Sequence, residues 1–186
     1  MDRNLGDDVA WYSDGDDSTD DETNALGPIT ALNYLNSQTA GWTNIPAITS
    51  YTYDNNLNGT TYDYGYQKLE IVNGIGQLTS KDGETITTLE GTSRARLITL
   101  EEAISLGCNE YEYDGSTNNT CPSWLYINLY KTGSTSGTSH LTLSTSITST
   151  YSYDWQAYGI DYEGVYDSRF VHSEYGNVRP VITITK

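Results

Sequence analysis

The sequence predicts an α+β fold, because two segments have the spacing of helices and much of the remainder has the pattern of short strands joined by turns. Apolar residues recur at helical spacing in 27–35 and again in 96–107. Asn58-Gly59 and Lys81-Asp82-Gly83 lie between β-rich runs and indicate hairpin turns. The 186 residues are enough to bury a core, so we expect a single domain over residues 1–186.

The first predicted helix begins near Pro28, and proline is favoured in the first turn of a helix. Ile29, Leu32 and Leu35 follow at three-residue spacing and share one face. We expect that face to be buried, and we expect Trp42 to lie where the helix meets the core.

Residues 47–92 alternate between strand-like runs and turns, and we expect them to form a β-rich insertion. Within this segment, the run from Lys68 to Leu78 predicts a pair of strands around Asn73-Gly74. An Asn-Gly pair suits a tight hairpin because both residues accept a positive φ.

The second predicted helix has the clearest boundaries. Thr99 is a suitable N-cap, and Glu102, three residues later, completes a capping box. Gly107 is placed to end the helix. Four residues share the face that we expect to be buried: Leu100, Ala103, Ile104 and Gly107.

Strands are also expected in the C-terminal half of the chain, at 140–147, at 155–161 and at 178–185. Residues 164–166 complete a hairpin with the second of these strands. No period of repeat length recurs, which excludes a repeat array.

Two cysteines, Cys108 and Cys121, are separated by twelve residues that are mostly turn formers. A metal site would need further Cys or His nearby, and a nucleophilic cysteine would need a partner base. The two histidines, His140 and His172, have no spacing that ties them to either cysteine. We therefore expect a disulfide, which favours an oxidising exterior.

The charge balance limits the possible partners. The chain has 25 acidic residues against 9 Lys plus Arg, a formal net charge of −16, and no basic patch. Such a surface repels phosphate backbones and anionic lipid, so we expect neither nucleic-acid binding nor direct membrane insertion. The sequence as it stands contains no targeting, transmembrane or lipidation motif.

The aromatic residues are mostly tyrosines, with 17 Tyr and 4 Trp but 1 Phe. Many of them lie in 149–176. Tyr supplies rigid contact area and a polar handle, so this segment is a candidate binding face. The alternative is alternate burial in a strand, and we expect Trp155 and Ile160 in the core. The candidate ligand-binding residues are Tyr151, Tyr153, Asp154, Tyr158, Asp161, Tyr162, Tyr166, Ser168, Arg169, Phe170 and His172.

A weak calcium candidate lies near the N-terminus, where Asp14, Asp16 and Asp20 place carboxylates at alternate positions. The pattern then fails, because the sixth position is Thr19 rather than Gly and the twelfth is Ala25 rather than Glu. A solvated acidic loop is the alternative. We expect no cofactor apart from this possible Ca²⁺.

No enzymatic motif stands out in the sequence. It contains no Gly-x-Ser-x-Gly, His-Glu-x-x-His, phosphate-binding loop or dinucleotide fingerprint. Glu101-Glu102 is a carboxylate pair, but capping explains Glu102. His172 lacks a nucleophile at a suitable spacing, so we expect a non-catalytic protein.

The order of several short motifs resembles a known family. Residues 1–6 resemble the opening segment of bacterial surface domains of the Fibrobacter succinogenes major paralogous family, and 96–102 resemble the helix start of that group and of formylglycine-generating-enzyme-like domains. Residues 144–146, 155–160 and 178–182 resemble the later strands of the same group. The resemblance implies a C-type-lectin-like fold, in which two short helices flank a small antiparallel sheet.

The sequence departs from that family at informative positions. Ile98 replaces a proline in the helix-start motif, and no cysteine follows Cys121, whereas the catalytic cysteines of the formylglycine-generating enzymes lie near their C-terminus. That activity is therefore not implied. The composition of 149–176 also resembles the variable patch of proteins diversified by retroelements, which lies late in this same fold.

We therefore expect a non-catalytic recognition domain on an extracellular surface, a cell or a virion, that binds a protein or glycan on another cell through the Tyr-rich C-terminal face. One alternative is a structural subunit of a surface fibre or pilus, whose strands would pack against neighbouring subunits. A second alternative is an enzyme of the formylglycine-generating type.

Overall fold

The computed structural model describes residues 27–55, 66–80, 82–109, 120–126, 139–146, 156–161, 164–170 and 176–183. The chain divides into two compact units. The described residues up to Arg96, with 180–183, form what we call the first-sheet unit, and those from Leu97 to Arg179 form the second-sheet unit. Both contain helix and sheet, which confirms the α+β class. The single domain over 1–186 stays a prediction.

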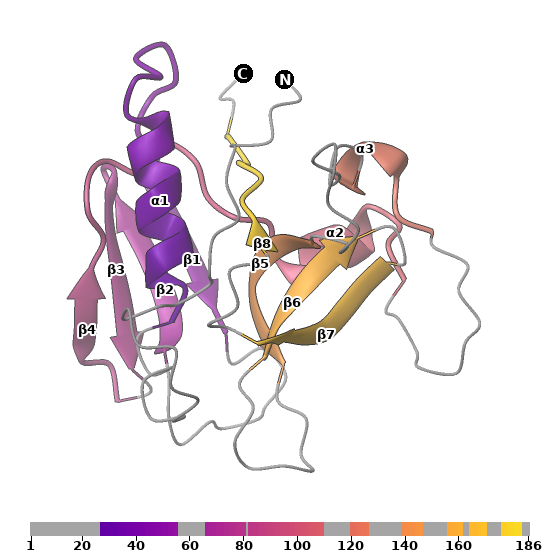
Figure 1. The fold of residues 1–186 in the computed structure, drawn as a ribbon. Coiled ribbons are helices and arrows are strands. Elements are labelled where there is room, and N and C mark those ends of the chain that lie inside the picture. Colours follow the sequence, from indigo (N-terminus) through magenta and orange to yellow (C-terminus); the bar gives the residue numbers. More distant parts are fainter. Residues whose placement is uncertain are drawn as a thin grey trace. The chain divides into compact units, whose positions relative to one another are not determined.

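The first-sheet unit contains a four-stranded antiparallel sheet in the order β1-β2-β3-β4 (Figure 1). Its strands are β1 (Ser50–Asp54), β2 (Tyr66–Val72), β3 (Ile75–Ser80) and β4 (Thr85–Thr88). Each strand pairs with the next along the chain, as a meander does. The strands predicted within 47–92 are therefore present, while their status as an insertion stays a prediction.

Two tight turns join the last three strands. Asn73 and Gly74 have φ of 50° and 80°, the left-handed values that a two-residue hairpin turn needs. This confirms the strand pair predicted around them. Gly83 has a φ of 80° and its N–H donates to the Ser80 carbonyl at 3.0 Å, which confirms the second predicted turn. Asn58-Gly59 lies outside the described residues.

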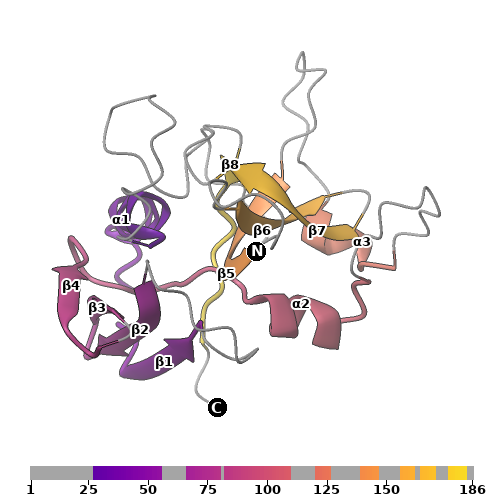
Figure 2. The same ribbon diagram turned by 90° about the horizontal axis from the view of Figure 1, so that it is seen from below.

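The helix α1 (Ile29–Thr39) lies across one face of this sheet (Figures 1 and 2). Tyr53, Leu69 and Leu78 are neighbours in register on three strands and are buried. The helix contributes Ala31, Leu32 and Leu35 to the same core. The prediction for Leu32 and Leu35 is therefore confirmed, while Ile29 and Trp42 are each half-buried.

Two asparagines of α1 hold the segment that follows β4. The Asn36 amide donates to the Glu90 carbonyl at 2.8 Å and to Ser93 Oγ at 3.2 Å. One turn earlier, Asn33 Oδ1 accepts from the Glu90 N–H at 2.8 Å. Asn36 is buried, so these bonds satisfy a polar group that would otherwise be costly to bury.

The predicted terminal strand at 178–185 is wrong for the residues that the structure describes. Val181 forms an isolated antiparallel bridge with Arg96, with N–H to O distances of 3.0 and 2.8 Å, and 178–183 contain no strand. A strand needs successive paired residues, and among the described residues Arg96 and Val181 pair at this one position, so the ladder does not extend. Arg96 is further held by its guanidinium, which lies 4.5 Å from the centre of the Tyr51 ring.

The second-sheet unit contains the strands β5 (Ser139–Ser146), β6 (Gln156–Asp161), β7 (Gly164–Phe170) and β8 (Gly176–Asn177), in the order β7-β6-β5-β8. β5, β6 and β7 pair antiparallel, which confirms the predicted strands and the hairpin. β8 pairs with β5 in parallel, so this sheet is mixed rather than purely antiparallel.

The helix α2 (Leu100–Ser105) begins and ends as predicted. Thr99 Oγ1 accepts from the Glu102 N–H, and Glu102 Oε2 accepts from the Thr99 N–H, each at 3.1 Å. After the helix, Gly107 has a φ of 104°, and the N–H groups of Gly107 and Cys108 donate back to the last turn. This is the Schellman arrangement, in which a left-handed glycine satisfies the final carbonyls.

Two residues of the predicted buried face, Ile104 and Gly107, are exposed. Leu100 and Ala103 are buried, but 42 % of Ile104 is exposed to solvent. Ile104 lies about 100° around the helix from Ala103, and a helix of six residues buries only a narrow stripe. The prediction for Ile104 was therefore wrong. The prediction for Gly107 was wrong because this residue lies beyond the last turn, where it ends the helix.

A disulfide joins Cys108 to Cys121, which confirms the predicted pairing. The short helix α3 (Ser123–Tyr126) follows it, with Leu125 buried and Trp124 half exposed. No helix within the described parts of the chain is long and apolar enough to cross a membrane.

Candidate recognition site

The candidate ligand-binding residues divide into those that the structure places and those that it does not describe. Six of them lie on the hairpin of β6 and β7, namely Tyr158, Asp161, Tyr166, Ser168, Arg169 and Phe170. The others lie outside the described residues, namely Tyr151, Tyr153, Asp154, Tyr162 and His172. The structure therefore brings more than half of the candidates onto one supersecondary element.

The hairpin is anchored by one buried apolar pair. Ile160 on β6 lies directly opposite Val165 on β7, and their exposed fractions are 1 % and 0 %. The expectation that Ile160 belongs to the core is confirmed, while Trp155 lies outside the described residues. Burial in the core, which the competing interpretation of this segment expects, therefore holds for these two positions.

The register of the hairpin contains a bulge. Gly159 lies opposite Tyr166 and Ala157 lies opposite Arg169, so between these pairs one residue on β6 matches two on β7. An extra residue on one strand increases the local twist and changes the direction of the residues beside it. The bulge falls beside three candidate residues, Tyr166, Ser168 and Arg169, and bulges are frequent next to functional sites.

β7 is the last strand of its sheet in the described part of the chain, and its outer edge is bonded at one point. The Val165 N–H donates to the Asn109 carbonyl at 3.2 Å. Asn109 directly follows Cys108 of the disulfide, so this bond joins the hairpin to the end of α2.

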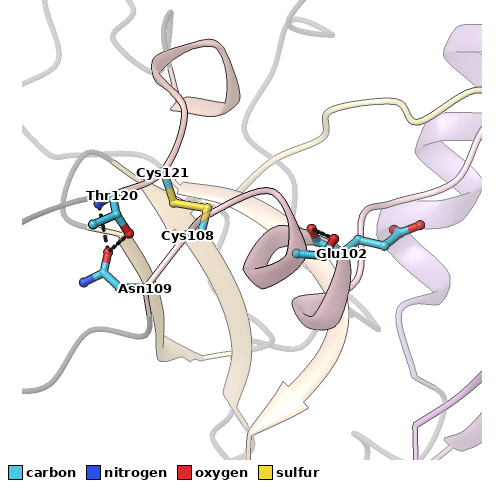
Figure 3. Close-up of a disulfide and its surroundings, with 6 residues drawn as sticks. Glu102, Cys108, Asn109, Thr120 and Cys121 are labelled. Carbon is cyan, nitrogen blue, oxygen red and sulfur yellow. Dashed lines mark hydrogen bonds between the residues drawn. A yellow bond between two sulfur atoms is a disulfide. The ribbon is translucent and has the colours of Figure 1, made fainter.

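Around the disulfide, four residues form what we call the disulfide corner: Cys108, Asn109, Thr120 and Cys121 (Figure 3). Asn109 Oδ1 accepts from the Thr120 N–H at 3.0 Å and from the Thr120 hydroxyl at 3.1 Å. Both cysteines are buried. The sequence showed the cysteines but not Asn109, since an asparagine beside a cysteine has no distinctive pattern.

Exposed apolar side chains occur close in sequence to this corner. Ile104 and Leu106 on one side, and Trp124 on the other, are 42 %, 43 % and 51 % exposed. An exposed Trp is the kind of side chain that often contributes to binding faces. The backbone carbonyl of Trp124 accepts a hydrogen bond from the Arg179 guanidinium. This bond holds the backbone of α3 and does not involve the indole ring of Trp124.

Metal binding has no structural support in the part of the chain that the structure describes, where no group of three or more His, Cys, Asp or Glu side chains gathers. The weak calcium candidate, Asp14, Asp16 and Asp20, lies outside the described residues. The possible Ca²⁺ site therefore stays a prediction.

Comparison with known proteins gives no relative. No protein-family model, curated protein or solved structure matches the chain at a significant level. The case for function therefore depends on the sequence pattern and on the hairpin.

Proposed function

We propose that the chain is a non-catalytic recognition domain with a C-type-lectin-like fold, exposed on an extracellular surface, which binds a protein or glycan on another cell through residues 149–176. The observation that carries the proposal is the β6–β7 hairpin. It holds six of the candidate residues on paired strands that are anchored by the buried pair Ile160 and Val165.

A hairpin of this kind supports recognition for an energetic reason. Binding is weakened by the ordering of loops and side chains at the interface, so residues on already paired strands lose less freedom than residues on a free loop. Tyr and Arg then add large contact areas and hydrogen bonds, and they are enriched among the residues that dominate binding energy.

The proposed location is supported by the disulfide. A buried bond between Cys108 and Cys121 is compatible with an oxidising exterior, where such bonds persist. The net charge of −16 favours solubility and disfavours phosphate backbones as partners. Diversification of 149–176 by a retroelement is part of the proposal, and sequencing the gene across a population would show whether substitutions concentrate in this segment.

The test is direct binding of the purified, fluorescently labelled chain to a glycan array and to a panel of intact bacterial cells. We expect the wild type to bind a subset of these probes, and the double variant Tyr166→Ser, Arg169→Ala to lose at least about tenfold in affinity, as paired hot-spot residues do. The matched control is the double variant Thr52→Ala, Gln77→Ala, because both residues are exposed on the first sheet.

Three results would count against the proposal. If the wild-type chain bound none of the probes, the proposed function would have no support. If the control variant lost as much affinity as Tyr166→Ser, Arg169→Ala, residues 149–176 would not be the binding face. Filaments in electron micrographs of the purified chain would favour the fibre subunit instead, since β7 ends its sheet in the described residues.

A further inference from the structure

A continuous series of local bonds leads from α2 to the hairpin. Gly107 ends the helix in a left-handed conformation, and the Cys108 N–H donates to the Ala103 carbonyl at 3.1 Å. The disulfide then holds Cys108 to Cys121. The next residue, Asn109, is the point at which this corner bonds to β7.

Asn109 makes two different kinds of contact at once. Its side-chain oxygen accepts from the N–H and the hydroxyl of Thr120, across the base of the segment that the disulfide closes. Its backbone carbonyl accepts from the Val165 N–H. The two side-chain bonds restrict the backbone conformation of Asn109. They therefore help to keep its carbonyl oriented toward the Val165 N–H.

The hydrogen bond from the Val165 N–H to Asn109 involves a residue of the buried pair that anchors the hairpin. Val165 is the second residue of β7 and lies opposite Ile160, so it belongs to the buried pair that anchors the hairpin. Its N–H donates to the Asn109 carbonyl, so the start of β7 is bonded to the disulfide corner on one side and paired with β6 on the other.

We propose that Asn109 is a positioning residue for the β6–β7 hairpin. Through Asn109, the disulfide holds β7 in the arrangement that binds the ligand. This inference rests on the proposed function. It adds a residue outside 149–176 to the recognition machinery, and it assigns to the disulfide a role in affinity as well as in stability. Asn109 acts through β7, to which its backbone carbonyl is bonded, and its side-chain bonds to Thr120 help to position that carbonyl.

The first experiment measures hydrogen exchange of individual backbone amides by NMR, in the folded chain. Asn109→Ala removes the acceptor for both Thr120 bonds and should raise the exchange rate of the Val165 amide roughly fivefold. Asn109→Asp keeps an acceptor oxygen and should restore the wild-type rate. The Leu69 amide of the first sheet should not change in either variant.

A matched control comes from the first-sheet unit. Asn33→Ala removes an asparagine oxygen that likewise accepts from a backbone N–H, that of Glu90. It should leave the Val165 rate unchanged. The double variant Cys108→Ser, Cys121→Ser should raise the Val165 rate at least as much as Asn109→Ala does. An unchanged Val165 rate in Asn109→Ala, or an equal rise at Val165 and Leu69, would overturn the inference.

The second experiment measures binding of the same variants to the glycan array and the cell panel. Affinity should fall in Asn109→Ala, recover in Asn109→Asp and stay at the wild-type level in Asn33→Ala. Wild-type binding with no loss in Asn109→Ala overturns this inference alone. Absence of wild-type binding overturns the proposed function, and with it the part of the inference that concerns recognition.

Discussion

Ile160 and Val165 lie directly opposite each other on β6 and β7, and both side chains are almost fully buried. The segment 149–176 is therefore not uniformly a surface. It contains core positions on the hairpin, on the same two strands as the six candidate residues that the structure places. This division makes separate predictions for the two kinds of residue.

The first prediction compares core and binding positions in that segment. Ile160→Ala should lower the free energy of unfolding by about 2–5 kcal/mol, because it removes buried carbon and leaves a cavity. Tyr151→Ala and Tyr162→Ala should change it by about 0.5 kcal/mol or less, as exposed substitutions do. Urea denaturation of each variant measures the difference. Equal destabilisation by the Tyr variants would mean that the aromatic residues are core, and the fibre subunit would then be preferred.

The second prediction concerns the disulfide. Replacing both Cys108 and Cys121 by Ser should lower the free energy of unfolding by about 3 kcal/mol, from the entropy that the closed loop removes from the unfolded chain. Denaturation of the two proteins measures this loss. The mass of the unreduced wild type should also be lower than that of the reduced protein by two hydrogens. Two free thiols in aerobically purified protein would contradict the bond.

The third prediction concerns the capping box of α2. Thr99→Ala removes the acceptor for the Glu102 N–H and should cost about 1 kcal/mol of stability. Thr99→Ser keeps a hydroxyl and should be close to wild type in the denaturation midpoint. Because Thr99→Ser also loses the buried methyl group, it is the control for that loss, and Thr88→Ala is the control for a threonine replaced at an exposed strand position. A midpoint that is the same in Thr99→Ala and wild type would show that the cap does not stabilise the helix.

The fourth prediction compares two apolar residues near α2. Leu97 is fully buried, whereas Ile104 is 42 % exposed. Leu97→Ala should cost about 2–5 kcal/mol, as buried leucines do. Ile104→Ala should cost about 1 kcal/mol or less, since a large part of this side chain stays exposed to solvent in the folded state. Thermal melts of the two variants decide the matter, and a larger loss in Ile104→Ala would contradict the exposure that the structure assigns to it.

The fifth prediction uses two glycines with the same backbone conformation and different surroundings. Gly74 and Gly83 each have a φ of 80°. A Cβ at Gly74 would meet Thr92 Cγ2 at 2.7 Å, whereas at Gly83, among the described residues and apart from its chain neighbours, no heavy atom lies within 4 Å. Gly83→Ala should cost about 1–2 kcal/mol from backbone strain, and Gly74→Ala should cost clearly more because a clash is added. Denaturation midpoints that rank the two variants in the opposite order would contradict this account.

The features that sequence analysis predicted correctly are those that depend on nearby residues. The capping box requires Thr99 and Glu102 three positions apart, and the β2–β3 hairpin requires Asn73-Gly74 between two apolar runs. Each arrangement satisfies its own hydrogen bonds or φ values, so the local sequence is enough to specify it. The paired cysteines belong to the same class, because a short turn-rich segment brings them together.

The features that sequence analysis missed or predicted wrongly depend on which other helices and strands pack or pair with an element. Ile104 has the right spacing for a buried face, but burial depends on whether another element covers that side of the helix. The strand expected at 178–185 has the right residues, but a strand also needs a partner along its length, and the bridge at Val181 does not extend.

The sequence by itself determined the α+β class, the start of α1, both ends of α2, the tight turns, the cysteine pair and the Tyr-rich composition of 149–176, because each depends on residue types at short separations. The tertiary structure alone decided that Val165 is the residue opposite Ile160 and that the Val165 N–H bonds to the Asn109 carbonyl. The second contact joins residues that lie 56 positions apart in the sequence. Backbone N–H and C=O groups are the same in nearly every residue, so a long-range bond between two of them leaves no pattern in the sequence.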